Sequence, residues 1–301
     1  MCLVGQSVVF EEAGNLINSL TGSNFNAKQI ERVCHLYGGL LEEQQLEIIE
    51  SGKAKEYSND EQEELHYAMI DGAMYPTREK EEPWKEIKLG RIFKYSDLLP
   101  FSENGNFITH SRYVAHLGTS KDFFPKFEYE IERLKNIVFI NDGGTWMWKW
   151  IESAYPNSIQ ILDFYHAKEH LCEFAKDYFK GEKERNQWVE EQSKNLLEST
   201  TEEVIQSIRD LENQETTNSK KEKLINYYTK NLKRMQYKLF RDKGLLIGSG
   251  AIESAHRVYQ GRFKLSGQHW TKNGLQKTIQ LKSAFESNQW DKVVQIAKIA
   301  A

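Results

Sequence analysis

Apolar and polar positions along the chain change their spacing near residue 65. Before that point the apolar side chains recur at helical intervals, as in the stretch between Asn26 and Gly38–Gly39. We therefore predict a small helical region over residues 1–64. In it, Asn26 caps a helix over 27–37, and the two glycines end that helix.

From residue 65 the spacing becomes that of strands. Three strands are expected in succession, at LHYAMIDGAMYPT, EIKLGRIFKY and NFITHSRYVAHLG, with REKEEP making the first hairpin turn. A helix follows over 121–135. Two parallel strands, NIVFIND and SIQILDFY, are then joined by a helix through Trp146, Trp150 and Ile151. This order predicts an α/β fold: an RNase H-like mixed sheet, made of a three-stranded meander plus a βαβ unit, flanked by helices.

The next stretch, from about 167 to 241, is charged, free of proline and helical in its spacing. Ser199 and Glu202 are spaced as a capping box within it. The glycine-rich GLLIGSG then breaks the pattern, and a further helix starts at Ala251. We therefore expect one RNase H-like domain over 65–301, interrupted by an all-helical insertion at about 167–241.

Composition adds a charge asymmetry to this picture. The net charge is −4, yet residues 220–282 hold fifteen Lys or Arg against three acids. A local basic surface of this kind suits phosphate binding, although a solvated lysine-rich helical face explains it equally well. The helices of residues 1–64 have two interpretations. They are the remnant of a DNA-binding region, or they form a helical hairpin that binds nothing, as most helical hairpins do.

The expected location is the cytoplasm. No run of eighteen apolar residues is present, so no membrane contact is expected. The N-terminal MCLVGQSVVFEEAG has no basic start and is interpreted as a first helix and not as a signal peptide. The three cysteines have no paired or metal-type spacing, which fits a reducing compartment.

Two aspartates stand out because each follows an apolar run and precedes glycine. Asp71 comes after Ala68–Ile70, and Asp142 comes after Ile137–Ile140 and before Gly143. An acid at a strand end with glycine beside it places a carboxylate at the rim of a sheet, where oxygen-seeking Mg²⁺ binds. Each Asp-Gly pair alone is equally typical of a turn.

A third acid, Glu253, lies in GSGAIESAHR, just inside the helix after the glycine break. Its small, neutral neighbours predict a helix packed closely on a sheet. Arg257 follows one turn later, where it could pair with Glu253 or touch a phosphate. The alternative is that Glu253 only complements the helix dipole.

The segment DFYHAKEH carries two competing interpretations. His166, Glu169 and His170 match the H-x-x-E-H spacing of inverted zinc peptidases, a short motif that often arises by chance. Alternatively, Asp163 and His166 support the metal-binding acids or contact DNA. A buried, hydrogen-bonded His166 without a catalytic role is the third possibility.

The segment RFKLSGQHW combines basic and aromatic side chains around a Ser-Gly turn. Arg262, Lys264 and Trp270 would suit a nucleic-acid backbone and an unstacked base. A helix end with an anchoring tryptophan is the alternative, and composition does not separate the two.

Taken in order, the motifs MIDGAMYPT, FINDGGTWMWKW, ILDFYHAKEHL, LLIGSGAIESAHR and RFKLSGQHW make the chain resemble ISKra-type insertion-sequence transposases. These belong to the RNase H-like DDE transposases, with the Mutator-like and hAT groups. The resemblance covers about residues 8–285. It implies a catalytic triad of Asp71, Asp142 and Glu253, with Asp163–His166 matching a further Asp-x-x-His motif.

The implied activity is metal-dependent DNA strand cleavage at the element ends, followed by strand transfer into target DNA. The triad would hold two Mg²⁺ ions, for which Mn²⁺ can substitute. The implied partners are double-stranded DNA, as terminal inverted repeats and target, and further copies of the chain on that DNA. The setting would be the nucleoid.

The chain departs from the family at two points. It has Asn141 where the family usually has glycine before the second acid, and it lacks the cysteine-bearing segment that precedes the first helices in other members. The alternative function is therefore a truncated, non-catalytic DNA-binding product of an insertion sequence. The zinc peptidase is the third.

Overall fold

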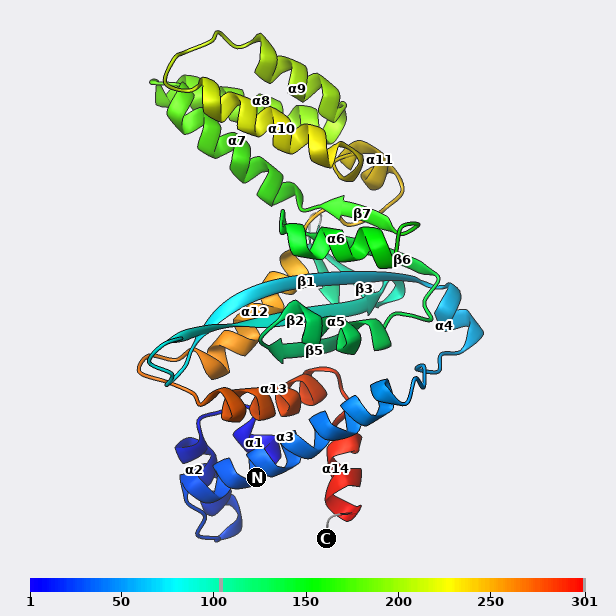
Figure 1. Cartoon of the computed structure of the whole chain (residues 1–301), viewed down its shortest axis with the longest axis vertical. Helices are drawn as coiled ribbons and strands as arrows, with labels where there is room; N and C mark the ends of the chain where they lie inside the picture. Colours follow the sequence, from blue (N-terminus) through cyan, green and yellow to red (C-terminus); the bar gives the residue numbers. More distant parts are fainter. Residues whose placement is uncertain (103–104, 300–301) are drawn as a thin grey trace. The chain divides into compact units, whose positions relative to one another are not determined.

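The computed structural model describes residues 1–102 and 105–299, and Figure 1 traces their elements. The chain forms two compact units. Unit 1 consists of Met1–Ile137 and Gly250–Ala301, and unit 2 of Val138–Ser249. The N-terminal helices belong to the same unit as the strands that follow them. The boundary after residue 64 stays a prediction.

Unit 1 contains three antiparallel strands. β1 (Leu65–Pro76) pairs with β2 (Trp84–Lys94), and β2 pairs with β5 (Arg112–Leu117). The REKEEP turn between β1 and β2 is confirmed. The third predicted strand is wrong in its first half: β4 (Gly105–Ile108) pairs instead with β3 (Leu98–Ser102). The polar Thr-His-Ser segment between β4 and β5 interrupts the extended run, so only β5 joins β2.

Helices cover this antiparallel sheet in unit 1. The sheet contacts α12 along β1 and β2, and contacts α13 and α5 along β5. The helix α3 contacts α13, and the apolar side chains between them form one core with those of the N-terminal helices. The helices of unit 1 are α1 (Cys2–Gly5), α2 (Phe10–Thr21), α3 (Ala27–Glu50), α4 (Asn59–Glu63), α5 (Ser120–Tyr129), α12 (Gly250–Phe263), α13 (Lys272–Glu286) and α14 (Trp290–Ile299), with a 3₁₀ turn η1 (Tyr95–Asp97).

The helix predicted to end at Gly38–Gly39 continues to Glu50 as α3. Its start is confirmed, because the Asn26 side chain accepts a hydrogen bond from the Gln29 NH in a capping box. The two glycines allow another helix to pack closely against α3 and do not end it. A Cβ at Gly38 would overlap the backbone carbonyl of Lys277, so the missing side chain lets α13 approach α3 closely.

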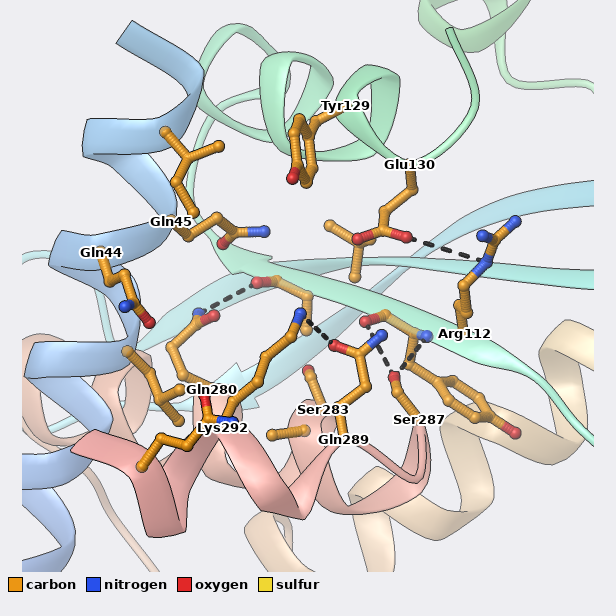
Figure 2. Close-up of a pocket in the computed structure, with 17 residues that line it drawn as sticks. Gln44, Gln45, Arg112, Tyr129, Glu130, Gln280, Ser283, Ser287, Gln289 and Lys292 are labelled. Atoms are coloured by element: carbon orange, nitrogen blue, oxygen red, sulfur yellow. Dashed lines mark hydrogen bonds and ion pairs between the residues drawn. The ribbon is translucent and has the colours of Figure 1, made fainter. Parts of the chain in front are cut away.

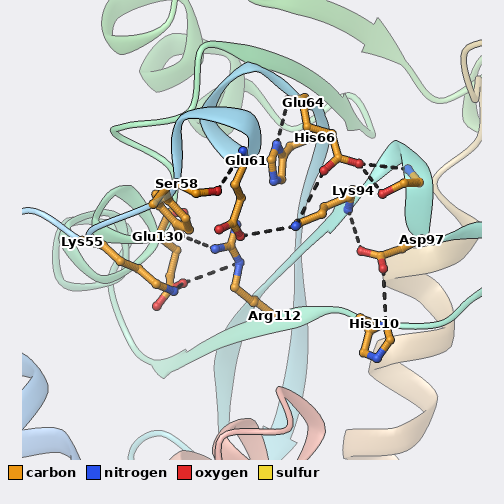
Figure 3. A network of polar contacts seen from close by, with 12 residues as sticks. Lys55, Ser58, Glu61, Glu64, His66, Lys94, Asp97, His110, Arg112 and Glu130 are labelled. Atoms are coloured by element: carbon orange, nitrogen blue, oxygen red, sulfur yellow. Dashed lines mark hydrogen bonds and ion pairs between the residues drawn. The ribbon is translucent and has the colours of Figure 1, made fainter.

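A polar network fixes the connection between α3 and β1 in unit 1 (Figure 3). Lys55 pairs with Glu130, and the Tyr57 hydroxyl donates 2.8 Å to the Glu130 carbonyl. Arg112 lies with its guanidinium 4.8 Å from the Tyr57 ring centroid and its Nε 3.7 Å from the Glu130 carboxylate. These contacts hold the link against α5 and β5, so the strand that follows enters the sheet from a fixed position.

Unit 2 is built on two parallel strands, β6 (Asn136–Asn141) and β7 (Ile159–Leu162), joined through α6 (Thr145–Ala154). The predicted βαβ order and parallel pairing are confirmed. The helical insertion begins at Phe164, three residues before its predicted start. It comprises α7 (Phe164–Tyr178), α8 (Glu182–Glu198), α9 (Thr201–Asp210), α10 (Asn218–Asn231), η2 (Leu232–Arg234) and α11 (Tyr237–Asp242), drawn from green to yellow in Figure 1.

The capping box predicted at Ser199 and Glu202 is displaced by one residue. Thr200 caps α9 by accepting from the Glu203 NH, while Ser199 ends α8. The fold is thus mixed α/β, with antiparallel strands in unit 1 and parallel strands in unit 2. No helix in the described ranges is both long and apolar enough to cross a bilayer.

Candidate functional site

The first predicted acid, Asp71, lies in the middle of β1 opposite Leu89 and not at a strand end. The predicted position is wrong because the strand continues past Gly72. The Glu86 side chain of the neighbouring strand occupies the space that a Cβ at Gly72 would need, so glycine here permits pairing and does not open a turn. The Asp71 side chain remains one-third exposed.

Asp71 faces helix α12 of the same unit. Its Oδ2 lies 3.3 Å from Nε2 of His256, and its Oδ1 accepts a 2.7 Å hydrogen bond from the Gly72 NH. Burial lowers the pKa of His256 to about 4, while a hydrogen bond with the Asp71 backbone opposes that shift. The imidazole is therefore neutral near pH 7, and the 3.3 Å contact is not a salt bridge. No role was assigned to His256 from the sequence.

Glu253 and Arg257 both lie exposed on α12. Arg91 of β2 fixes the start of this helix: its Nη1 donates 2.7 Å to the Ala251 carbonyl and 2.9 Å to Ser254 Oγ. Arg91 was missed from the sequence, although a lone arginine inside the buried apolar pattern of a strand was a usable signal. Unit 1 thus presents Asp71 and Glu253 from two elements in contact.

The second predicted acid, Asp142, directly follows β6, and its strand-end position is confirmed. Its Oδ1 accepts a 2.9 Å hydrogen bond from the Gly144 NH, and its backbone carbonyl accepts one from Trp148 Nε1 at 2.8 Å. The side chain is partly exposed. Asp142 is therefore held in position with its carboxylate still accessible.

Asp163, the acid of the Asp-x-x-His motif, is 2% exposed and uses both carboxylate oxygens within unit 2. Its Oδ1 caps α7 by accepting from the His166 NH at 2.6 Å, and its Oδ2 accepts from the Ser249 NH. These bonds fix the start of α7 and the return of the chain from the helical insertion. The geometry assigns Asp163 a structural role and favours Asp142 as the accessible acid.

The two histidines of the H-x-x-E-H segment lie side by side on α7, with ring centroids 4.8 Å apart. Nδ1 of His166 lies 3.6 Å from the exposed Glu169, and the His170 ring packs 4.3 Å from that of Tyr227. Burial lowers the pKa of His170. The spacing does bring the two rings together, as either a metal pair or an aromatic cluster requires.

The segment RFKLSGQHW spans the end of α12 and the residues that follow it, and two of its side chains are buried in the core of unit 1. Arg262 is 1% exposed, and its Nε and Nη2 donate 3.1 and 2.9 Å to the Gly5 carbonyl. Trp270 is buried, with its Nε1 donating 3.0 Å to the Phe263 carbonyl. The burial of both side chains inside unit 1 does not favour the expected DNA contacts of Arg262 and Trp270. Lys264 remains exposed, 5.3 Å from the Trp84 ring centroid.

The three predicted carboxylates are oxygen donors of the kind that Mg²⁺ prefers. Two of them lie in unit 1 and the third in unit 2. Across residues 1–102 and 105–299, no three His, Cys, Asp or Glu side chains are grouped as a metal-binding set. The donor chemistry of the three side chains fits the ion.

A polar cavity of about 270 Å³ lies in unit 1 between α3, β5, α13 and α14 (Figure 2). Its walls show how α13 meets the edge strand. Gln280 Nε2 donates 3.2 Å to the Ala115 carbonyl, and Ser287 Oγ accepts 2.8 Å from the Tyr113 NH. Gln276 Oε1 accepts 2.8 Å from the Leu117 NH. The cavity therefore lies beside the side-chain hydrogen bonds that attach α13 to the backbone of β5.

Residues 119–298 match the model of UPF0236, described as an uncharacterised protein family. Because this match covers more than half of the chain, the protein belongs to the UPF0236 family. A Streptococcus gallolyticus protein described as "UPF0236 protein in vanSb 3'region" is 27% identical over 182 residues. That alignment covers 57% of this chain and 39% of the relative, so the chain spans well under half of that protein's length. The family match includes Asp142 and Glu253 and begins after Asp71.

Proposed function

We propose that the chain is the catalytic part of an RNase H-like DDE transposase that cleaves DNA at element ends and joins them to target DNA. The observation that carries the proposal is the position of Asp142. It follows the first of two parallel strands, is partly exposed, and is held by the Gly144 NH. A carboxylate fixed at a strand end is what metal-assisted phosphodiester chemistry requires, and the sequence resemblance assigns that role to the same residue.

In this proposal Asp71 and Glu253 act on the same phosphodiester as Asp142. Supporting observations come from unit 1, where α12 packs on β1 and His256 lies against the Asp71 carboxylate. The exposed Arg257 and Lys264 remain available to neutralise phosphates.

The proposed cofactor is a pair of Mg²⁺ ions held by Asp71, Asp142 and Glu253, with Mn²⁺ as a substitute. Bound there, they would supply an activated water or 3′-hydroxyl and stabilise the leaving oxygen. The three side chains would provide the oxygen ligands, and the backbone bonds to Asp71 and Asp142 would orient two of them. The proposed partners are duplex DNA and further copies of the chain, in the cytoplasm at the nucleoid.

Nicking of supercoiled plasmid by the purified chain with Mg²⁺ or Mn²⁺ tests the proposal. We expect metal-dependent nicking that Asp142→Ala and Glu253→Ala each reduce by at least about a hundredfold, the scale of losing a charge-stabilising group. Glu169→Gln is the matched control, because this exposed acid would be essential only in the zinc peptidase. Loss of nicking in Glu169→Gln together with retention in Asp142→Ala would contradict the proposal.

A second candidate is a protein that binds DNA without cutting it. The observation in its favour is the basic stretch of residues 220–282, whose fifteen Lys or Arg against three acids suit phosphate binding whether or not the chain cuts DNA. Under either candidate, DNA affinity should fall steeply as salt rises, because lysine and arginine displace counterions from phosphates. Salt-sensitive binding by a wild-type chain that does not nick would favour this second candidate.

A further inference from the structure

Tyr227 of α10 has a buried hydroxyl that the fold of unit 2 leaves unpaired. Its Oη finds no hydrogen-bond partner among residues 1–102 and 105–299. Other buried polar atoms of the described residues also lack a partner, so it is the position of this hydroxyl, close to Asp142, that calls for an explanation. The adjacent Tyr228 shows the usual arrangement, since its hydroxyl donates 2.7 Å to the Ala167 carbonyl.

The unpaired hydroxyl points at the backbone that directly follows Asp142. A Cβ at Gly143 would lie 2.7 Å from Tyr227 Oη and 3.2 Å from His166 Nε2. Both polar atoms therefore converge on one glycine at the end of β6. Any side chain at Gly143 would clash with the Tyr227 hydroxyl, so glycine lets this hydroxyl lie directly against the chain that follows Asp142.

The surroundings keep the hydroxyl protonated. Burial raises the pKa of Tyr227, and the negative charges of Asp142 and Asp163 raise it further. The protonated hydroxyl can therefore donate a hydrogen bond to an acceptor oxygen of a ligand.

A cavity of about 650 Å³ starts at Tyr227 and His170 and runs between α7 and α10. Its walls carry Lys176, Lys220 and Lys223 against two acids, Glu173 and Asp177, and Asp177 is paired with Lys220 at 2.6 Å. The balance of charge along this wall is positive, which suits a negatively charged ligand and offsets the charge of Asp142.

We propose that Tyr227 Oη and His166 Nε2 bind a phosphate oxygen beside Asp142, with the lysine-bearing cavity receiving the rest of the ligand. This inference rests on the proposed function, in which the phosphate belongs to DNA. It adds two positioning residues that hold the phosphodiester against the accessible acid. A free phosphate compound presents the same oxygen and is the alternative source.

The test compares Tyr227→Phe with its matched control Tyr228→Phe. Each variant removes one hydroxyl and keeps the ring. Tyr227→Phe should leave the thermal unfolding midpoint unchanged or raised, because the lost hydroxyl has no partner in the fold. Tyr228→Phe should lower the midpoint, because its buried hydrogen bond to Ala167 disappears.

Binding is measured by calorimetric titration of inorganic phosphate, with and without Mg²⁺, and by anisotropy of a short fluorescent DNA duplex. We expect Tyr227→Phe to bind phosphate and duplex about tenfold more weakly than wild type, the scale of one hydrogen bond to a charged group. Tyr228→Phe should bind both as wild type does.

Unchanged phosphate affinity in Tyr227→Phe, or no phosphate binding by the wild type under either condition, overturns the inference. A loss for phosphate alone, with duplex affinity unchanged, overturns the assignment to DNA and identifies a free phosphate compound as ligand. Because none of these readouts needs strand cleavage, a chain that never nicks plasmid would defeat the proposed function and leave the phosphate site standing.

Discussion

His116 of β5 lies within a buried group of charges in unit 1. Its Nδ1 is 3.3 Å from Nζ of Lys126, an ammonium that is 2% exposed and pairs with Glu42 at 2.5 Å. Burial, and then the positive charge of Lys126, lower the pKa of His116 to about 4, while Glu42 and Asp122 oppose the shift. The neutral imidazole accepts the Lys126 hydrogen bond, so protonation would remove an acceptor and add a second cation.

Acid should therefore destabilise unit 1 through His116. The folded pKa of about 4 lies below the ordinary value of 6.5, so the unfolded chain binds the proton more readily. The stabilisation is complete above about pH 6.5, declines as the pH falls and is lost below about pH 4, and it is on the order of 2–3 kcal/mol. Urea unfolding across this range should show a weaker pH dependence for His116→Asn. The exposed His110→Asn should follow wild type, and equal slopes for all three chains would refute the assignment.

At the scale of single residues, the sequence predicted the chemical type of the candidate site residues better than their positions and neighbours in the fold. Asp142 was placed correctly because an acid after a short apolar run marks a strand end. Asp71 was misplaced because the strand continues through a glycine whose space a cross-strand neighbour fills, a contact that local sequence does not encode. Arg262 was assigned to DNA because its residue type suits phosphate, whereas its burial depends on the carbonyl of Gly5, far away in the chain.

At the scale of elements, α13 closes the free edge of β5. Gln276, Gln280 and the C-terminal cap Ser287 bind backbone groups of three alternate residues of the strand. Exposed edge strands are templates for pairing with other chains, and proteins cover or interrupt them. The helix thus replaces the missing neighbour strand with side-chain hydrogen bonds.

Gln280→Leu should leave the buried Ala115 carbonyl without its partner. We expect a loss of about 1–2 kcal/mol in the free energy of unfolding, together with concentration-dependent association, since β5 then has a bare acceptor at its edge. Denaturant unfolding and light scattering measure the two effects. Gln45→Leu alters the same cavity from α3 and should change neither (Figure 2). Wild-type stability in Gln280→Leu would show that α13 does not protect the strand.

Most elements were predictable from the sequence because their patterns are local. The apolar runs of β1 and β2, the Asn26 cap and the parallel pair of unit 2 all follow from local sequence. The continuation of α3 past Gly38 was not predictable, because glycine ends a helix unless another backbone needs its space. Here α13 needs that space, and its contact residue, Lys277, is distant in sequence.

At the scale of the whole chain, the first helices are structural parts of unit 1. Buried Cys2, Ala13, Ile30 and Cys34 form one core cluster with residues of α13 and α14. Deleting residues 1–60, as a search for a DNA-recognition region would suggest, should therefore unfold unit 1. The loss of DNA binding that follows would then report instability and not lost recognition.

Calorimetric melting checks this expectation. The deletion should abolish the cooperative transition of unit 1, because α13 loses the surface on which it packs. Leu20→Gln is the control, since this side chain is 82% exposed on α2 and should leave the melt unchanged. A truncated chain that melts cooperatively at the wild-type temperature would show that residues 1–60 form an independent module.

The order of the two units along the chain also determines which unit is completed first during synthesis. Unit 2 is continuous, whereas unit 1 needs Gly250–Ala301 as well as Met1–Ile137. At roughly 5–20 residues per second, Ile30 and Cys34 leave the ribosome on the order of ten seconds or more before Leu281, with which they form a core. A nascent chain that has passed residue 249 therefore carries a complete unit 2 and an unfinished unit 1. Until residues 250–301 have been synthesised, the apolar face of α3 lacks the helix that covers it and is a surface to which chaperones can bind.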